Sequence, residues 1–307
     1  RLCGKASWFL PFNKGNNDGA GNPPNPDGIK TDYLWKEILT KESLSNILEN
    51  YSQVVEKIDR KTNKVVGETM IFPRYHQLTV VRKLLADTLR NEVGKRYLIQ
   101  HSAGSGKSNS IAWLAYQLVK LEKSGKNFFD SIIVVTDRVN LDRQIRDTIR
   151  QFMQERSVVG WADDSSTLGS LLNAGKKIII TTIHKFPFIL SSIGTENKDK
   201  QFAIIIDEAH SSQTGSLFAK MNMAVSGNVC DDEEDIEDKI NKLIEGHRMV
   251  RNANYYAFTA TPKNKTLEMF GDAIPQPDGQ VRHVAFHTYS MRQAIQEGFI
   301  LDVLEHY

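Results

Sequence analysis

Two short motifs, about one hundred residues apart, constrain this chain more than any other feature. The first is HSAGSGKS at residues 101–108, and the second is IIIDEAH at residues 204–210. A glycine-rich stretch ending in Gly-Lys-Ser is the pattern of a phosphate-binding loop, and an apolar strand ending in Asp-Glu supplies carboxylates for a metal and a water. Together the motifs predict the two halves of a nucleoside-triphosphate hydrolysis site.

The first motif lies between a predicted strand and a predicted helix. The apolar run 97–100 predicts a buried strand, and apolar residues at helical spacing over 111–121 predict a helix. Strand, glycine-rich turn and helix is the context that a P-loop requires. Gly104 and Gly106, with Ser105 between them, let the backbone curl so that consecutive N–H groups point at phosphates.

Two side chains after the glycines complete the predicted site for ATP and Mg²⁺. Lys107 adds a cation beside the phosphates, and Ser108 supplies a hydroxyl to the metal. The motif departs from the usual pattern at its first position, where His101 replaces a glycine. That replacement is tolerated if the backbone at this position needs no positive φ.

The second motif predicts the catalytic carboxylates. Four apolar residues, 203–206, precede Asp207 and Glu208, as expected for a central parallel strand whose carboxyl end faces the ligand. We expect Asp207 to hold Mg²⁺ through water and Glu208 to orient or deprotonate the attacking water. Taken alone, the motif also fits an ordinary strand end with solvated charges, but its position downstream of a P-loop favours catalysis.

A third segment, FPRYHQ at residues 72–77, precedes the P-loop and predicts contacts with the base of the nucleotide. Gln77 carries an amide that can pair with adenine through two hydrogen bonds. Arg74 or Tyr75 offers a planar group to stack on the base.

Polar residues at the ends of other predicted strands favour contacts with a phosphate backbone. Thr136 and Arg138 follow one strand, while Thr181, Thr182 and Lys185 follow another. For any single side chain, a solvated strand end is the alternative. A nucleic acid held at these strand ends would be contacted mainly at its phosphates.

The strand 256–262 ends in Thr-Ala-Thr-Pro after the Asp-Glu-Ala-His motif. In translocases this element couples the nucleotide site to a neighbouring domain. We therefore assign coupling roles to Thr259 and Thr261, together with His210.

The order of the segments predicts an α/β fold, a three-layer P-loop (RecA-like) domain with a mostly parallel sheet. Residues 11–32 predict an irregular segment, 35–56 a helix and 57–71 a hairpin. Helices and strands then alternate. The predicted strands are 97–100, 131–136, 177–182, 202–206, 255–259 and 282–286.

Composition sets broad limits. The formal net charge of the 307 residues is +2, so any basic surface must be local. Cys3 and Cys230 have no metal or disulfide spacing, which fits a reducing cytoplasm. The sequence contains no run of eighteen or more apolar residues, so it predicts no membrane-spanning helix. The chain begins at Arg1 rather than methionine, which suggests a fragment, and the acidic run 230–238 predicts a solvated insertion.

These motifs resemble those of superfamily 2 helicases and translocases. The general resemblance rests on residues 104–108, Thr136, 181–182, 207–210 and 259–262. A more specific resemblance, to the restriction (R) subunit of type I restriction-modification enzymes, rests on four groups of residues. They are Arg74-Tyr75-His76-Gln77; Thr136-Asp137-Arg138 with Leu141-Asp142 and Gln144; Thr182 with Lys185-Phe186; and 207–210 with Ser212-Gln213.

Two flanks strengthen the specific resemblance. Residues 9–15 and 19–23 look like the exit of that family's nuclease domain. Residues 289–295 and 298–303 look like the lead into its second motor domain. The resemblance implies a nuclease remnant and linker over 1–70, a first RecA-like motor domain over 71–303, and the start of a connection over 304–307.

The resemblance also implies an activity and partners. Such a subunit uses ATP to pump double-stranded DNA past methylation and specificity subunits in a bacterial or archaeal cytoplasm, and the complex cuts when translocation stalls. The resemblance places the nuclease carboxylates and the second motor domain outside these residues, so we expect this chain to bind ATP and Mg²⁺ and to hydrolyse ATP weakly. Two alternatives remain open, another superfamily 2 DNA or RNA helicase and a non-catalytic nucleotide-gated scaffold.

Overall fold

The structure is a computed structural model that describes residues 11–58, 65–136, 149, 158–162, 164–195, 197–207 and 250–302. Three predicted site residues, Arg138, Glu208 and His210, lie outside the described residues, as do the acidic run and both cysteines. Within the described ranges, no helix is both long and apolar enough to cross a membrane.

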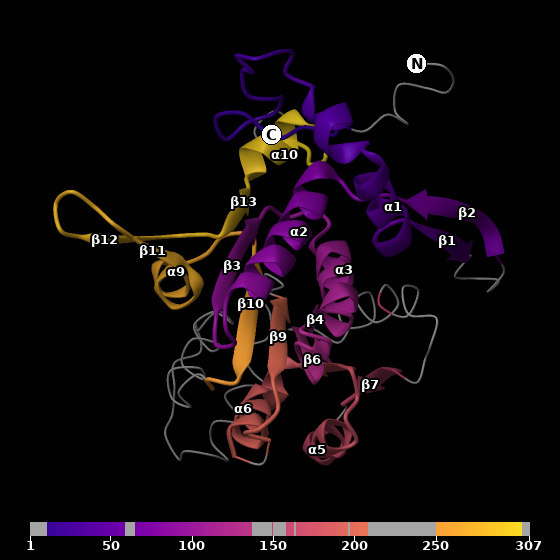
Figure 1. Cartoon of the computed structure of the whole chain (residues 1–307), viewed down its shortest axis with the longest axis vertical. Coiled ribbons are helices and arrows are strands. Elements are labelled where there is room, and N and C mark those ends of the chain that lie inside the picture. Colours follow the sequence, from indigo (N-terminus) through magenta and orange to yellow (C-terminus); the bar gives the residue numbers. More distant parts are fainter. Residues whose placement is uncertain are drawn as a thin grey trace.

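A seven-stranded sheet forms the centre of the domain, and every pair of neighbouring strands in it is parallel (Figure 1). The strand order is β13-β3-β10-β9-β6-β8-β7. In chain order, the strands are β3 (Arg96–His101), β6 (Ser131–Thr136), β7 (Val159–Trp161), β8 (Ile178–Thr182), β9 (Phe202–Asp207), β10 (Ala253–Thr259) and β13 (His287–Tyr289).

Helices cover both faces of this sheet because successive residues of each strand point to opposite faces. On β6, Ile132 and Val134 join the core beneath α2 (Tyr75–Arg90) and α3 (Lys107–Val119). Ile133 and Val135 instead join the core formed with the helices of the other face. Those helices are α5 (Ser165–Asn173), α6 (Phe186–Thr195), which follows a 3-10 turn η4 (Ile183–Lys185), and α9 (Asn264–Phe270).

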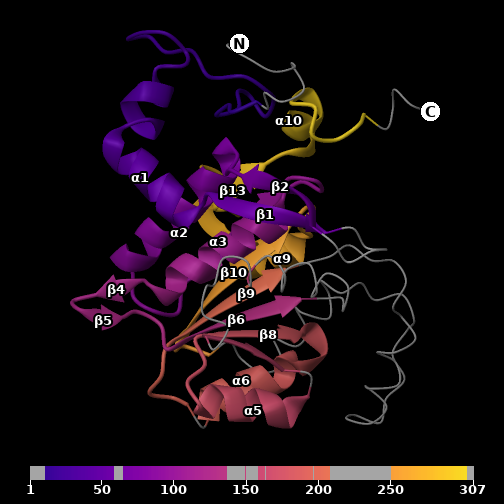
Figure 2. The ribbon, with the colours of Figure 1, turned by 90° about the vertical axis from the view of Figure 1, so that its right-hand side faces the viewer.

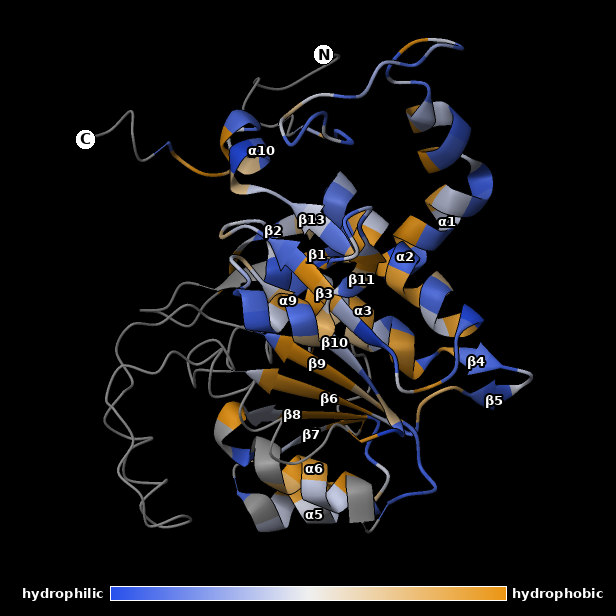
Figure 3. Ribbon diagram, turned by 90° about the vertical axis from the view of Figure 1, so that its left-hand side faces the viewer, coloured by the Kyte–Doolittle hydropathy of each residue, from blue (hydrophilic) through white to orange (hydrophobic). Residues whose placement is uncertain are grey.

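This arrangement confirms the predicted three-layer α/β fold. Figure 3 shows that β6 and β9 are hydrophobic along their length, as strands covered on both faces must be. All six predicted strands are present with boundaries within two residues of those expected, and five of them belong to the central sheet. The edge strand β7 was not predicted, because three residues are too few to give a periodic signal.

The N-terminal part has an irregular stretch followed by short elements. Residues 11–32 contain no helix or extended strand, as predicted. A π-helical turn η2 (Leu34–Ile38), helix α1 (Lys41–Asn50) and an antiparallel hairpin of β1 (Gln53–Ile58) and β2 (Val65–Ile71) follow. The hairpin was predicted.

The predicted helix 35–56 was wrong at its C-terminal end. Residues 53–56 belong to β1, where the β-branched Val54 and Val55 pair with Met70 and Thr69. Helical spacing extends as far as the fully buried Tyr51, whose carbonyl accepts a 2.9 Å hydrogen bond from Trp113 Nε1. That contact with α3 fixes the point at which the chain leaves α1.

The predicted strand 282–286 is present, but its expected place in the parallel central sheet was wrong. Residues Val281–Val284 form β12, which pairs with β11 (Asp272–Pro275) in a separate antiparallel hairpin closed by a turn at Gly279, where φ is +81°. The central sheet instead contains β13, which pairs with β3. Just before β13, Phe286 N donates a hydrogen bond to Leu98 O of β3. Helix α10 (Met291–Gln296) follows, and a small hairpin of β4 (Glu122–Lys123) and β5 (Lys126–Asn127) lies elsewhere, before β6.

Candidate nucleotide-binding site

The P-loop joins the carboxyl end of β3 to the first residue of α3. Gly104 and Gly106 both adopt left-handed backbone conformations, with φ of +71° and +79°, and Gly106 is the N-cap of α3. His101 is the last residue of β3 and is fully buried. Its strand backbone needs no positive φ, which meets the condition under which the usual glycine can be replaced.

Gly106 has no room for a side chain. A Cβ atom there would lie 2.5 Å from Gln77 Nε2, in addition to the strain of a positive φ. We expect Gly106→Ala to weaken ATP binding at least about tenfold, because about 1.4 kcal/mol of strain in the bound loop has that effect. Equilibrium binding of a fluorescent ATP analogue measures this change.

Gly175→Ala is the matched control for that variant. Gly175 has a similar φ of +67°, but a Cβ atom added there would meet no described atom within 4 Å. The control should lose stability and keep its affinity for nucleotide. Equal affinity losses in both variants would contradict a specific role for the packing of Gly106.

The start of α2 holds the P-loop from beneath. Gln77 Oε1 accepts a hydrogen bond from Arg74 N, while Gln77 Nε2 donates to Ser105 O and Gly106 O at 3.2 and 3.0 Å. His76 Nε2 lies 3.0 Å from Ser105 O and must be the donor, because a carbonyl only accepts. The structure therefore places the Gln77 amide against the loop backbone, and recognition of adenine by Gln77 stays a prediction.

Arg74 and Tyr75 point toward different parts of the chain. Arg74 donates from its guanidinium to Gly104 O at 3.2 Å, and the guanidinium lies 3.7 Å from the centre of the Phe299 ring. Tyr75 instead makes edge contacts with Phe12 and Tyr33 of the N-terminal part. Arg74 is thus the better placed of the two to meet a base beside the P-loop.

The remaining predicted residues gather at the carboxyl edge of the sheet. Lys107 Nζ donates to His101 O and Ser102 O at 3.2 and 3.3 Å, and Ser108 follows it in the first turn of α3. Asp207 ends β9 and is 5% exposed. The strand β10 lies between β3 and β9, and its Thr259 is aligned with Gln100 on β3.

This edge fits a bound nucleoside triphosphate with its metal. The buried hydroxyls of Ser102, Ser105 and Thr259 find no hydrogen-bond partner among the described residues, so each retains hydrogen-bonding capacity. The left-handed glycines give the loop the backbone form that turns N–H groups toward an anion. Lys107 and Ser108 would hold the phosphates and Mg²⁺, with Asp207 on the metal.

Several residues behind the P-loop were not predicted. His101 Nε2 lies 2.9 Å from His287 Nδ1, and the ring of His76 stacks on Tyr289 at 3.7 Å. The Tyr289 hydroxyl donates to Glu297 at 2.7 Å. The replacement of glycine by His101 was a signal that this position packs against a partner, but the sequence does not identify His287.

These contacts connect the P-loop to the segment 289–300. Ser102 N donates to Tyr289 O at 2.9 Å, and Ile300 lies 3.3 Å from a Cβ placed on Gly104. Burial lowers the pKa of His76 to about 4 and that of His287 to about 3. Burial also holds the pKa of His101 well below its ordinary value, so all three imidazoles are neutral at pH 7.

The predicted DNA contacts lie at the same edge of the sheet but differ in exposure. Thr136 and Thr181 are fully buried, and their hydroxyls donate to Thr181 O and Ala162 O. Thr182 and Lys185 are partly exposed, with Lys185 Nζ 3.3 Å from Thr182 Oγ1. Thr182 and Lys185 are therefore the two that present polar atoms near the surface. Thr261, predicted to couple domains, is exposed just beyond β10.

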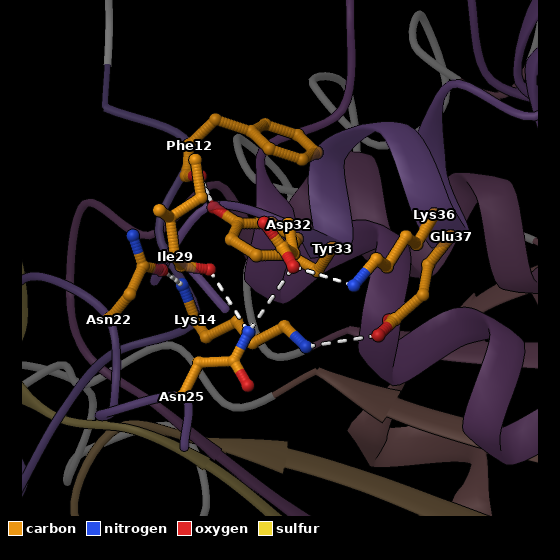
Figure 4. Close-up of polar contacts among 9 residues, drawn as sticks. All are labelled: Phe12, Lys14, Asn22, Asn25, Ile29, Asp32, Tyr33, Lys36 and Glu37. Carbon is orange, nitrogen blue, oxygen red and sulfur yellow. Dashed lines mark hydrogen bonds and ion pairs between the residues drawn. The ribbon is translucent and has the colours of Figure 1, made fainter. Parts of the chain in front are cut away.

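The irregular N-terminal stretch packs beside this site. Figure 4 shows its polar contacts, in which Lys14 Nζ pairs with Glu37 at 3.2 Å and the Tyr33 hydroxyl donates to Phe12 O. The stretch also reaches α10, because Ala20 N donates to Gln296 Oε1 at 2.8 Å. Figure 2 shows α10 and the N-terminal stretch at the same end of the molecule.

Solved structures with similar folds include a fragment of an HsdR subunit of a type I restriction enzyme from Vibrio vulnificus YJ016, with 17% identity and a TM-score of 0.43. Mss116p bound to ssRNA and AMP-PNP has 13% identity and a TM-score of 0.42. The Sulfolobus solfataricus SWI2/SNF2 ATPase core in complex with dsDNA has 15% identity and a TM-score of 0.36. These matches cover 90%, 82% and 61% of this chain but 38%, 44% and 31% of the respective structures.

A search among curated proteins gave no significant match. A sequence profile of the SWI2/SNF2 ATPase family, in contrast, matches residues 76–306, which include the start of α2, the P-loop and the Asp-Glu-Ala-His motif. Both the matched motifs and the parallel sheet that brings Lys107 and Asp207 to one edge are those of a nucleotide-hydrolysing domain. The chain belongs to the SWI2/SNF2 ATPase family.

Proposed function

We propose that this chain is the ATP-binding half of the DNA-translocating motor of a type I restriction enzyme R subunit. The observation that carries the proposal is the contact between the two flanks that resemble such subunits. The backbone of Gly15 in the first flank lies against the Gln293 side chain in the second, and Ser290 Oγ donates at 3.0 Å to the carbonyl of Asp18, which joins the two parts of the first flank. The flanks thus form one cap beside the P-loop.

The chain's own residues provide the functions of an ATPase site. When bound, Mg²⁺ and ATP supply the γ-phosphoryl group and a metal charge that offsets its negative charge. Lys107 and the loop N–H groups bind and orient the phosphates. Asp207 would hold the metal, and Glu208 would orient or deprotonate the attacking water. Arg74, held over Phe299, lies beside the loop where a base would stack.

Double-stranded DNA is the proposed track, and the methylation and specificity subunits of a type I complex are the proposed partners, in a bacterial or archaeal cytoplasm. Thr182 and Lys185, together with Arg138, are the proposed phosphate contacts on this domain. Phosphate contacts carry no sequence information, so target recognition is assigned to the other subunits.

Binding of different nucleic acids tests this proposal against another superfamily 2 helicase. Fluorescence anisotropy should be measured with labelled double-stranded DNA, single-stranded DNA and single-stranded RNA of equal length. We expect double-stranded DNA of any sequence to bind most tightly, with affinity that falls steeply as salt rises. Preference for RNA, or discrimination between DNA sequences, would contradict the assignment.

A further inference from the structure

A second charged region lies at the opposite edge of the sheet from the P-loop. An open cleft of about 880 Å³ is found where the parallel strands begin. Its lining includes five cations from three parts of the chain, which are Lys123, Lys126, Lys198, Lys200 and Arg251. Three carboxylates, Glu92, Asp130 and Asp199, also line it. The charged residues that line the cleft therefore sum to +2, a local excess of positive charge.

Within the described part of the chain, no ion pair neutralises the cations of the cleft. Both ion pairs among those residues, Lys14–Glu37 and Asp32–Lys36, lie in the N-terminal part. Lys200 Nζ donates to Leu172 O at 3.3 Å, a neutral acceptor that leaves its positive charge uncompensated. Lys123 lies 5.6 Å from the centre of the Phe128 ring, which also leaves its charge in place.

The floor of the cleft is a fixed framework of hydrogen bonds. The Asn252 amide donates to three carbonyls, those of Ile193, Asn197 and Lys200. Asp130 accepts from Gln201 N at 2.7 Å, and Asp130 N donates back to Gln201 O. The carboxylate of Asp130 thus already accepts a backbone hydrogen bond. The hydrogen bonds of Asn252 hold the turn that carries Lys198 and Lys200 in place.

Nearly all of the cleft's side chains are polar. Of its lining residues, Val93 and Phe128 are the apolar ones, and Phe128 is 6% exposed. Protein partners usually require exposed apolar or aromatic anchors, whereas a phosphate backbone requires cations and amides alone. Figure 3 shows the strands β4 and β5 at this edge as hydrophilic. The chemistry favours a nucleic-acid backbone over an acidic protein.

We infer that this cleft is a second contact site for double-stranded DNA, separate from the nucleotide site and reached by the phosphate backbone. The inference rests on the proposed function, because the choice of DNA follows from a DNA motor. A contact at this edge leaves the P-loop edge open to ATP. It gives the domain a second hold on the duplex, independent of the strand ends of β6 and β8.

The test replaces three exposed cations of the cleft together, Lys123→Gln, Lys126→Gln and Lys198→Gln. The matched control replaces three exposed lysines on the N-terminal part and α2, Lys30→Gln, Lys41→Gln and Lys83→Gln. Anisotropy with double-stranded DNA of random sequence is recorded over a salt series. Binding of a fluorescent ATP analogue is measured for each protein.

We expect the cleft variant to bind DNA about tenfold or more weakly, with a salt slope smaller by about 2 to 3 because each lost phosphate contact removes about one. The control should differ from wild type by less, and ATP binding should be unchanged in both. If wild type binds DNA and the cleft variant binds it with the same affinity and slope, the cleft inference alone is overturned.

Two other results separate this failure from failure of the proposed function. If wild type binds ATP but no double-stranded DNA at low salt, both the proposed function and the cleft inference are overturned. A labelled oligoglutamate peptide serves as the second probe. If the cleft variant loses this peptide while DNA binding stays intact, the cleft is a site for an acidic protein, and the inference for DNA is overturned.

Discussion

Lys107→Ala is expected to reduce ATP turnover about 10²- to 10³-fold, the loss typical when one preorganised charge-stabilising donor is removed from a transition state. Lys107 begins α3 directly after Gly106, at the point where loop N–H groups and the helix N-terminus converge. No other residue in the P-loop motif carries a positive charge at pH 7, since His101 is buried and neutral. Steady-state phosphate release measures the effect.

The fold should survive this change. Lys107 Nζ donates to two backbone carbonyls, and such hydrogen bonds contribute about 1 kcal/mol each. Lys120→Ala provides the matched control, because Lys120 is an exposed lysine at the C-cap of the same helix. The control should keep its turnover. Turnover by Lys107→Ala close to that of the control would remove the P-loop from the catalytic account.

Acidification from pH 6.5 to 4 is expected to cost several kcal/mol of stability through the three buried histidines. Burial lowers the pKa of His76 to about 4, against an ordinary value of 6.5. That difference alone corresponds to about 3 kcal/mol. His101 and His287 add to it, because burial lowers the pKa of both and nearby Lys107 and Lys83 lower them further.

The direction follows from proton binding in the two states. The histidines of the unfolded chain take up protons as pH falls through 6.5, whereas the folded histidines stay neutral until much lower pH. The unfolded state therefore binds more protons in this window, so the free energy of unfolding decreases as the pH is lowered. Above pH 6.5 this contribution to stability is fully present.

His287→Asn isolates one of the three groups. The asparagine amide can keep a hydrogen bond to His101 and cannot take up a proton in this range. Urea unfolding at a series of pH values should give a pH slope that is smaller than wild type by about 1.4 kcal/mol per unit. Identical slopes in both proteins would show that His287 is accessible to protons in the folded state.

The sequence predicted the parts of the fold and site that local patterns determine. Buried strands such as β6 and β9 appear as continuous apolar runs, and Gly106 is required by the turn into α3. The strand that ends at His101 was predicted to within one residue. Each of these features depends on neighbouring residues in the sequence.

The parts that the sequence did not show depend on contacts between distant segments. Residues 282–286 have the alternation of a strand, but they pair with β11 in a hairpin, and β13 lies beside β3 instead. Recognition of adenine by Gln77 stays a prediction, and the sequence did not show that its amide also contacts the P-loop backbone 28 residues away. The stack of Arg74 on Phe299 joins two segments that are far apart in the sequence, so no local pattern predicts it.

The most direct test of the proposed motor is ATP turnover with and without double-stranded DNA, measured for the wild-type chain and for Glu208→Gln. The account predicts weak turnover that double-stranded DNA stimulates more than RNA does, and that Glu208→Gln abolishes while ATP binding persists. Turnover that DNA does not stimulate, or that persists in Glu208→Gln, would contradict a DNA-stimulated ATPase in which Glu208 activates the attacking water.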